Sequence, residues 1–181
     1  MTVFISGGCK NGKSALAQRA AVRLSGGGPL YYVATMIPYD GEDRARIARH
    51  IAGRAGMGFE TLELARDIGR CLELADPGGT FLVDSVTALL LNEMYPDGHT
   101  GDADPDAVRR CVDGLLRVAK CAGNAVFVSD YIYSDSIRYD AFTEKYRADL
   151  AGIDRALARV CDTVLEMCAG HFIVHKGAWE E

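Results

Sequence analysis

Residues 2–14 read TVFISGGCKNGKS, in which a short β-rich run leads into a glycine loop of the form G-x-x-x-x-G-K-[ST]. A helical pattern, SALAQRAAVRL at residues 14–24, follows directly. The loop therefore lies between a predicted strand and a predicted helix. In that context glycines let successive backbone N–H groups turn toward phosphate oxygens, and the helix N-terminus adds a positive end. The motif predicts a triphosphate-binding loop in which Lys13 contacts the β- and γ-phosphates and the Ser14 hydroxyl binds Mg²⁺.

Along the rest of the chain, apolar runs alternate with helical patterns. We predict strands at residues 2–6, 30–34, 80–83, 125–129, 163–167 and 172–174, the last two as a candidate hairpin. We predict helices at residues 14–24, 42–55, 64–75, 86–95, 105–122 and 139–160, and a mobile loop at residues 95–106. The alternation is typical of an α/β fold with a mostly parallel sheet and helices on both faces. Ligands bind such sheets at the carboxyl ends of the strands, which are therefore the expected site.

Size and composition exclude several classes of protein. A chain of 181 residues with 49% hydrophobic and 25% charged residues is typical of one globular domain, here residues 1–181. The net charge of −5 provides no basic excess for a nucleic-acid backbone. No apolar run approaches the roughly 20 residues that span a bilayer, and the first residues lack a signal-peptide pattern. With six cysteines in no CxxC pair, we expect reduced, buried thiols and a cytoplasmic location.

A second phosphate-site element lies at residues 81–84, where the apolar run FLVD ends in Asp84. This is the form of a Walker B strand, whose carboxylate holds Mg²⁺ directly or through water. By itself the signal is weak, because any buried strand can end in an aspartate. Together with the phosphate loop it predicts a Mg²⁺-dependent nucleoside-triphosphate site, without specifying the reaction.

The helix predicted after Asp40 carries an unusual charged face. Helical spacing places four residues on it: Asp43, Arg46, His50 and Arg54. Ile47 and Ile51 lie beside this face, where we expect them to anchor the helix to the core. An imidazole between two guanidiniums is expected to stay neutral with a free lone pair, while the arginines neutralise phosphate oxygens. Spacing alone leaves two interpretations, a solvated face with an incidental histidine, or a nucleophile that forms a phosphoramidate.

Taken together, these segments resemble the bifunctional adenosylcobinamide kinase/adenosylcobinamide-phosphate guanylyltransferase family of cobalamin biosynthesis. The matching pieces are GGCKNGKS at 7–14, YVAT at 32–35, D-x-E-x-x-x-R-I-x-x-H-x-x-x-R at 40–54, T-x-E at 61–63 and DSVT at 84–87. Residues 146–152 and 162–164 match more loosely. The R-I-x-x-H-x-x-x-R run after a phosphate loop is the most specific element, and it favours the catalytic interpretation of His50.

The resemblance implies a P-loop NTPase fold of the RecA-like type. It implies an enzyme, usually trimeric, that phosphorylates the aminopropanol hydroxyl of adenosylcobinamide with GTP or ATP. It implies a second step in which GMP passes from GTP through His50 to adenosylcobinamide phosphate, giving adenosyl-GDP-cobinamide and pyrophosphate. Glu63 would accept hydrogen bonds from guanine N1–H and N2–H₂, which favours GTP over ATP. The candidate nucleotide contacts are Gly7, Gly8, Cys9, Lys10, Asn11, Gly12, Lys13, Ser14, Ala34, Thr35, Met36, Arg46, Ile51, Ala52, Gly53, Arg54, Glu63 and Asp84.

Two segments depart from the family pattern. Residues 130–136 read DYIYSDS where the family usually has an N-E-V-G-x-G-I-V-P stretch. Arg54 is followed by AGMGF at 55–59, where the family's R-P-x-x-W segment is one residue shorter and has Trp in place of Phe. Two interpretations of the 130–136 loop stay open, a modified acceptor site and a surface that packs on a neighbouring subunit. Two other functions also stay open, a P-loop small-molecule kinase without guanylyl transfer and a non-catalytic nucleotide-binding relative.

Overall fold

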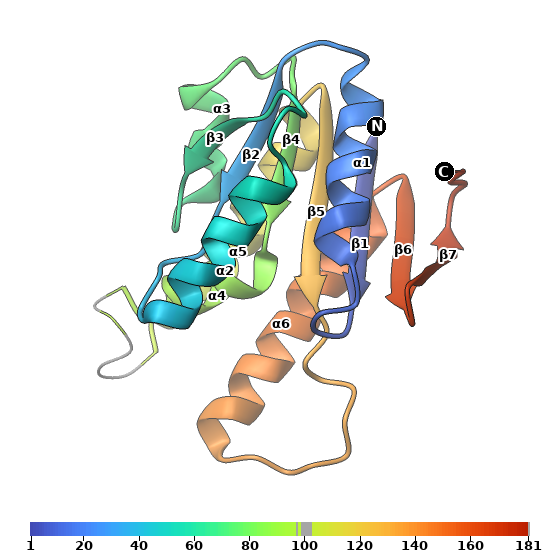
Figure 1. The fold of residues 1–181 in the computed structure, drawn as a ribbon. Coiled ribbons are helices and arrows are strands. Elements are labelled where there is room, and N and C mark those ends of the chain that lie inside the picture. Colours follow the sequence, from blue (N-terminus) through green and yellow to red (C-terminus); the bar gives the residue numbers. More distant parts are fainter. Residues whose placement is uncertain (97, 99–102, 181) are drawn as a thin grey trace.

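The seven strands form one sheet in the order β3-β2-β4-β5-β1-β6-β7, as the computed structural model shows for residues 1–96, 98 and 103–180 (Figure 1). All neighbouring strands are parallel except β7, which runs antiparallel to β6. The strands are β1 Thr2–Gly7, β2 Leu30–Ala34, β3 Glu60–Glu63, β4 Thr80–Asp84, β5 Asn124–Asp130, β6 Thr163–Cys168 and β7 His171–Lys176. This topology confirms the predicted fold class, including the hairpin at the end of the chain.

Helices cover both faces of the sheet, and a hydrophobic core lies on each face (Figure 1). The helices are α1 Lys13–Ser25, α2 Gly41–Gly53, α3 Cys71–Leu74, α4 Val86–Met94, α5 Ala107–Cys121 and α6 Ala141–Val160, with a 3₁₀ turn at Ile68–Arg70. Successive strand residues alternate between the faces: Phe81 and Val83 lie in the core beneath α4, α5 and α6, whereas Leu82 lies in the core beneath α1. Burial on both sides explains why these strands read as continuous apolar runs.

The helix predicted over residues 64–75 is wrong. The chain there continues from β3, because the backbone N–H of Leu64 still donates to the carbonyl of Ala34. Asp67 then adopts a left-handed conformation, with φ 49°, which a continuous α-helix does not allow. A 3₁₀ turn and the single turn of α3 follow. The helical spacing of the apolar residues correctly predicted which side chains are buried, since Ile68 and Cys71 lie in the core. It did not predict the backbone conformation.

Strand β3 was missed for a different reason. It is a four-residue edge strand, and three of its four residues are exposed. Such a segment shows neither a long apolar run nor a clear alternation. Of the predicted mobile loop at 95–106, residues 97 and 99–102 lie outside the described residues. No helix in the described part of the chain has the length and apolar character needed to cross a membrane. All six cysteines are free thiols, but they are not all buried as expected. Cys71, Cys111 and Cys161 are buried, whereas Cys9, Cys121 and Cys168 are exposed.

A buried carboxyl group lies between α6 and β5. Asp154 is 3% exposed, and its Oδ2 accepts hydrogen bonds from the hydroxyls of Ser129 (3.0 Å) and Tyr133 (2.9 Å). Among the described residues its Oδ1 has no partner. Burial raises the pKa of Asp154, and the negative charge of Asp130 raises it further. The two hydrogen bonds lower it, and the resulting pKa is about 6.

We expect Asp154→Asn to be more stable than the wild type at neutral pH and about equally stable near pH 4. Because the pKa of Asp154 is about 6 in the folded state and 3.8 ordinarily, the folded protein binds the extra proton between these values. The wild type therefore loses stability as pH rises through that window, by at most about 3 kcal/mol, and the variant does not. Urea unfolding at both pH values measures this. An identical pH dependence for the two proteins would show that Asp154 is ionised when folded.

Candidate active site

The phosphate loop closes tightly between β1 and α1. Gly12 has φ 96°, a left-handed conformation suited to glycine, and a Cβ there would lie 3.2 Å from the Met167 side chain. The side chain of Asn11 donates to the carbonyl of Met167 and ties the loop to β6. Lys13 is 5% exposed, and its Nζ donates to the Gly8 carbonyl at 2.6 Å. The loop thus forms a cradle at the carboxyl end of β1 that holds a buried positive charge.

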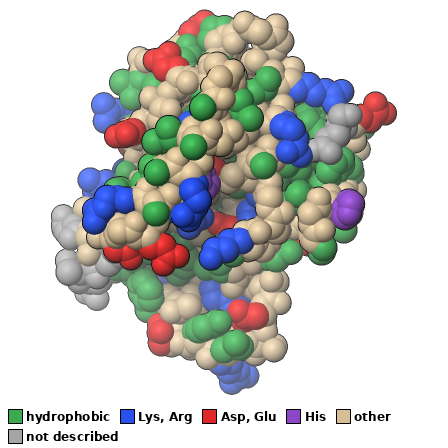
Figure 2. Space-filling model, viewed as in Figure 1, with side chains coloured by type: hydrophobic (Ala, Val, Ile, Leu, Met, Phe, Trp, Pro, Cys, Tyr) green, Lys and Arg blue, Asp and Glu red, His purple; other side chains and the backbone are tan. Residues whose placement is uncertain are grey.

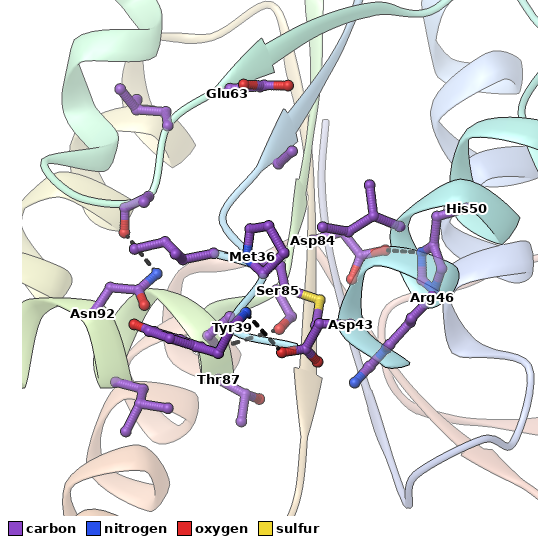
Figure 3. A pocket seen from close by; sticks show the side chains of 18 of the residues that line it. Met36, Tyr39, Asp43, Arg46, His50, Glu63, Asp84, Ser85, Thr87 and Asn92 are labelled. Atoms are coloured by element: carbon purple, nitrogen blue, oxygen red, sulfur yellow. Dashed lines mark hydrogen bonds and ion pairs between the residues drawn. The ribbon is translucent and has the colours of Figure 1, made fainter. Parts of the chain in front are cut away.

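His50 points from α2 toward the carboxyl ends of β2 and β4 (Figure 3). Its Nδ1 lies 3.4 Å from the Tyr32 hydroxyl and 3.7 Å from Asp84 Oδ2, and Tyr32 donates to that oxygen at 2.8 Å. Burial raises the pKa of Asp84, but the adjacent His50 and the hydrogen bonds from Tyr32 and Ser14 lower it and hold it below its usual range. The carboxylate is therefore ionised and faces Nδ1, which leaves Nε2 as the ring nitrogen with a free lone pair in the neutral imidazole.

The two arginines of the predicted face play different parts. Arg54 is 8% exposed, lies 4.0 Å from the Tyr32 ring centroid and donates to Thr61 Oγ1 at 3.0 Å, so it braces the end of α2 against β2 and β3. Arg46 is exposed beside the cavity described below (Figure 3). The prediction that two guanidiniums flank His50 therefore needs correction. Arg54 is engaged by Tyr32 and Thr61, and the carboxylate of Asp84 faces the imidazole.

A cavity of about 600 Å³ opens between α2, α4 and the carboxyl ends of β2, β3 and β4. Figure 2 shows a hollow on this face of the molecule, with Lys and Arg side chains beside it. Seven of the predicted site residues line the cavity: Ala34, Met36, Arg46, His50, Arg54, Glu63 and Asp84. The phosphate loop does not line it but adjoins it through two contacts, because Lys13 pairs with Asp130 and Ser14 with Asp84.

Several predicted contacts lie elsewhere. Ile51, Ala52 and Gly53 are exposed and do not line the cavity. The expectation that Ile47 and Ile51 anchor α2 to the core is wrong, because α2 has no buried residue. Ile47 lines the cavity, and the side chain of Ile51 is 53% exposed. Instead the Asp40 side chain caps the helix by accepting from the Asp43 N–H at 2.8 Å. Thr35 is fully buried, and its hydroxyl bonds the backbone of residue 85. α2 thus forms a wall of the cavity rather than part of the core.

Ser14 and Asp84 supply oxygen donors that suit Mg²⁺. The Ser14 hydroxyl helps to lower the pKa of the Asp84 carboxyl, so both oxygen donors lie beside the phosphate loop. In the part of the chain that the structure describes, no three His, Cys, Asp or Glu residues form a metal-binding group. Mg²⁺ commonly takes one or two protein oxygens and completes its shell with phosphate and water. The donor set therefore fits a metal that arrives with a nucleotide.

A sequence model described as cobinamide kinase / cobinamide phosphate guanyltransferase matches residues 3–174. The chain belongs to this family. The bifunctional adenosylcobalamin biosynthesis protein CobP of Pseudomonas aeruginosa (strain ATCC 15692) is 30% identical to it over 179 residues, which cover 98% of each chain. The predicted enzyme class, a bifunctional kinase and guanylyltransferase of cobalamin biosynthesis with a nucleotide substrate, is thereby confirmed.

Solved structures also resemble this cobinamide kinase / guanyltransferase chain. One solved ATPase domain has a TM-score of 0.50 and 11% identity, over 91% of this chain and 68% of that one. A prototypical ATPase from the type III secretion system of pathogenic bacteria has a TM-score of 0.53 and 15% identity, over 91% of this chain and 50% of that one. At such low identity they show the fold alone, and it is the P-loop ATPase fold that the sequence predicts.

Three polar residues of this family member's site were not singled out from the sequence. Tyr32 links His50 to Asp84, and Asp130 links the phosphate loop to the cavity. Asn92 is 3% exposed and donates to the carbonyls of residues 35 (2.7 Å) and 65 (3.1 Å), which ties α4 to the segments after β2 and β3. Tyr32 carried a signal because it belongs to the matching segment at 32–35, and Asp130 did because it directly follows a predicted strand. Asn92 carried none.

The loop after β5, which departs from the family pattern, is anchored by Arg147. This side chain is 6% exposed and donates to the carbonyls of Ile132 (3.0 Å) and Ile137 (3.1 Å) and to Asp135 Oδ1 (3.0 Å). Of residues 130–136, all described, Asp130 alone lines the cavity. The loop therefore lies along α6 and presents its first residue to the site.

Proposed function

We propose that this protein phosphorylates adenosylcobinamide with GTP or ATP, and that it then passes GMP from GTP to adenosylcobinamide phosphate through a guanylyl group on His50. The observation that carries the guanylyl step is the orientation of His50. Its Nδ1 faces Tyr32 and Asp84, and the imidazole lines a cavity that adjoins the phosphate loop. A histidine held by a carboxylate through one nitrogen is poised to use the other as a nucleophile.

The guanylyl step divides into two displacements at one phosphorus. His50 Nε2 donates its lone pair to the α-phosphorus of GTP, the bond to the bridging oxygen of the β-phosphate breaks, and pyrophosphate leaves with that electron pair. Lys13 and the loop N–H groups stabilise the charge on the phosphates, while Asp84 stabilises the positive ring. A phosphate oxygen of adenosylcobinamide phosphate then attacks the same phosphorus and releases the imidazole. Such a division produces ping-pong kinetics.

We propose Mg²⁺ as the metal of this site, with Ser14 and Asp84 as its protein ligands. When bound, Mg²⁺ neutralises charge on the nucleotide phosphates. The placement of Asp84 also leaves its Oδ2 engaged with Tyr32 at 2.8 Å, so the same carboxylate serves both the metal and the orientation of His50.

We further propose that residues 1–181 act as one nucleotide-binding domain within a homotrimer in the cytoplasm. The length supports one domain, the family resemblance supports the trimer, and six free thiols suit a reducing compartment. The corrinoid acceptor and the nucleotide are then the expected small-molecule partners.

Glu63→Gln is expected to weaken GTP binding about tenfold or more while changing ATP binding little. The Glu63 carboxylate lines the cavity at the end of β3, where it would accept two N–H groups of guanine; the amide replaces a charged acceptor with a neutral one. Equilibrium titration with each nucleotide measures the difference. Glu60→Gln is the matched control, since Glu60 is exposed on the same strand outside the cavity. An equal loss for both nucleotides would contradict a base-reading role.

The experiment that tests the proposed function is incubation of the full chain with Mg²⁺ and α-labelled GTP. A guanylyl-histidine leaves label on the protein that is lost in acid and stable in alkali. Label that passes to added adenosylcobinamide phosphate supports the proposal. If the protein takes no label but phosphorylates adenosylcobinamide, it is a small-molecule kinase. If it binds GTP tightly and forms neither product, it is a non-catalytic relative.

A further inference from the structure

Asp130 occupies the point where the phosphate loop meets the cavity. It is the last residue of β5, and its backbone N–H donates to Thr87 Oγ1 at 2.9 Å. The next N–H, of Tyr131, donates to the Gly7 carbonyl at 3.2 Å. These two hydrogen bonds hold the backbone of Asp130 between α4 and the phosphate loop. Its position is therefore determined by the fold and not by a free loop.

The carboxylate of Asp130 belongs to both sites. Its Oδ1 lies 2.7 Å from Lys13 Nζ, and its side chain is 18% exposed to the cavity that His50 and Asp84 also line. The lysine of a phosphate loop contacts the β- and γ-phosphates of a bound nucleotide. A carboxylate in direct contact with that lysine therefore lies close to the γ-phosphate, on the side from which a molecule in the cavity approaches.

We propose that Asp130 is the general base of the kinase half-reaction, a proposal that rests on the proposed function. The hydroxyl of the acceptor gives its proton to the Asp130 carboxylate. The hydroxyl oxygen forms a bond to the γ-phosphorus, and the bond from that phosphorus to the β-bridging oxygen breaks. The nucleoside diphosphate leaves with the electron pair, and Lys13 stabilises the charge on it. The products are the phosphate ester, the diphosphate and a protonated carboxyl group.

Other carboxylates of the site are less suited to this task. Asp84 already accepts from Tyr32 and faces His50. Asp43 lines the cavity from α2, where it accepts from the Tyr39 backbone N–H at 3.1 Å. Glu63 lies at the end of β3, remote in the sheet from the strand that carries the phosphate loop. Asp154 is buried and carries no surface toward the cavity. Asp130 combines contact with the phosphate-loop lysine and exposure to the cavity.

The two half-reactions differ in their need for a base. In the kinase step the nucleophile is a hydroxyl that must lose a proton. In the guanylyl step the nucleophiles are an imidazole lone pair and a phosphate oxygen, which is already anionic. Loss of the Asp130 carboxylate should therefore separate the two activities, whereas general damage to the nucleotide site should lower both.

The test compares Asp130→Asn with the wild type in two separate assays, phosphorylation of adenosylcobinamide and GMP transfer to supplied adenosylcobinamide phosphate. We expect the kinase kcat to fall about 100-fold or more, the range of general-base catalysis, and GMP transfer to fall less than about fivefold. Asp113→Asn, at an exposed carboxylate of α5, is the matched control. Because Asn leaves Lys13 buried without its ion pair, urea unfolding and GTP affinity of each variant are measured alongside.

A kinase kcat within about threefold of the wild type in Asp130→Asn would overturn the proposal, since general bases contribute far more. Equal losses in both assays would also overturn it, because they would mean that the carboxylate only supports the phosphate loop. The proposed guanylyl step is judged separately. A wild type that takes no label from α-labelled GTP but phosphorylates adenosylcobinamide would remove the guanylyl-histidine and leave the kinase comparison intact.

Discussion

His50→Asn protein is expected to take up no label from α-labelled GTP and to lose GMP transfer by on the order of 10⁴-fold or more. The reason is chemical, because asparagine offers an amide nitrogen without a basic lone pair. GTP binding should persist, since the contacts that hold the phosphate loop to β5 and β6 do not involve His50. The measurement is the amount of protein-bound label that is lost in acid and retained in alkali, compared between the variant and the wild type.

The matched control for this variant is His171→Asn, because His171 lies exposed at the start of β7 and outside the cavity. It should take up as much label as the wild type. Full label on His50→Asn would place the covalent group on another residue and remove the nucleophile from the mechanism. Equal loss of label in both variants would indicate damage to the fold.

Lys13→Ala is expected to lower kcat/KM for both the kinase and the guanylyl step by about 10³-fold. Both reactions develop charge on phosphate oxygens, and Lys13 is the buried cation of the phosphate loop, held at 2.6 Å by the Gly8 carbonyl and at 2.7 Å by Asp130. The two steady-state assays measure the loss. Undiminished turnover in either would rule out the loop as the phosphate site for that step.

Loss of Lys13 also leaves the Asp130 carboxylate without its ion pair, which lowers stability. Urea unfolding of the variant therefore accompanies the kinetics, and GTP is added to test whether nucleotide still stabilises the fold. Lys120→Ala is the control, since Lys120 is exposed in the last turn of α5. If the Lys13→Ala protein is folded but has low turnover and weak GTP binding, the loss of activity is due to the phosphate loop.

The pair formed by His50 and Asp84 changes what was expected of this site. The sequence suggested that flanking arginines keep the imidazole available. In the structure one of them, Arg54, is committed to Tyr32 and Thr61, and the group that faces Nδ1 is a carboxylate. Orientation by a carboxylate, rather than repulsion by cations, then selects the nitrogen that reacts.

Most strands and helices could be predicted because their signals are local. The apolar runs at residues 30–34 and 80–83 form strands that are buried on both faces of the sheet. A short continuous apolar run is typical of such a strand. Residues 60–75 could not be predicted, because β3 exists only through its pairing with β2 and the apolar spacing after it reflects contact with the core. Pairing between distant segments leaves no periodic signal of its own.

The phosphate loop was determined by the sequence alone. Its residues are consecutive, and the glycines, the lysine and the following helix set its conformation locally. The rest of the site was decided by the tertiary structure. Tyr32 and Asp84 are 52 positions apart and meet because β2 and β4 are parallel neighbours in register, with α2 bringing His50 above them. Asp130 reaches Lys13 because β5 lies beside β1. Parallel crossovers gather the carboxyl ends of strands at one edge, and only strand order and register decide which side chains face each other there.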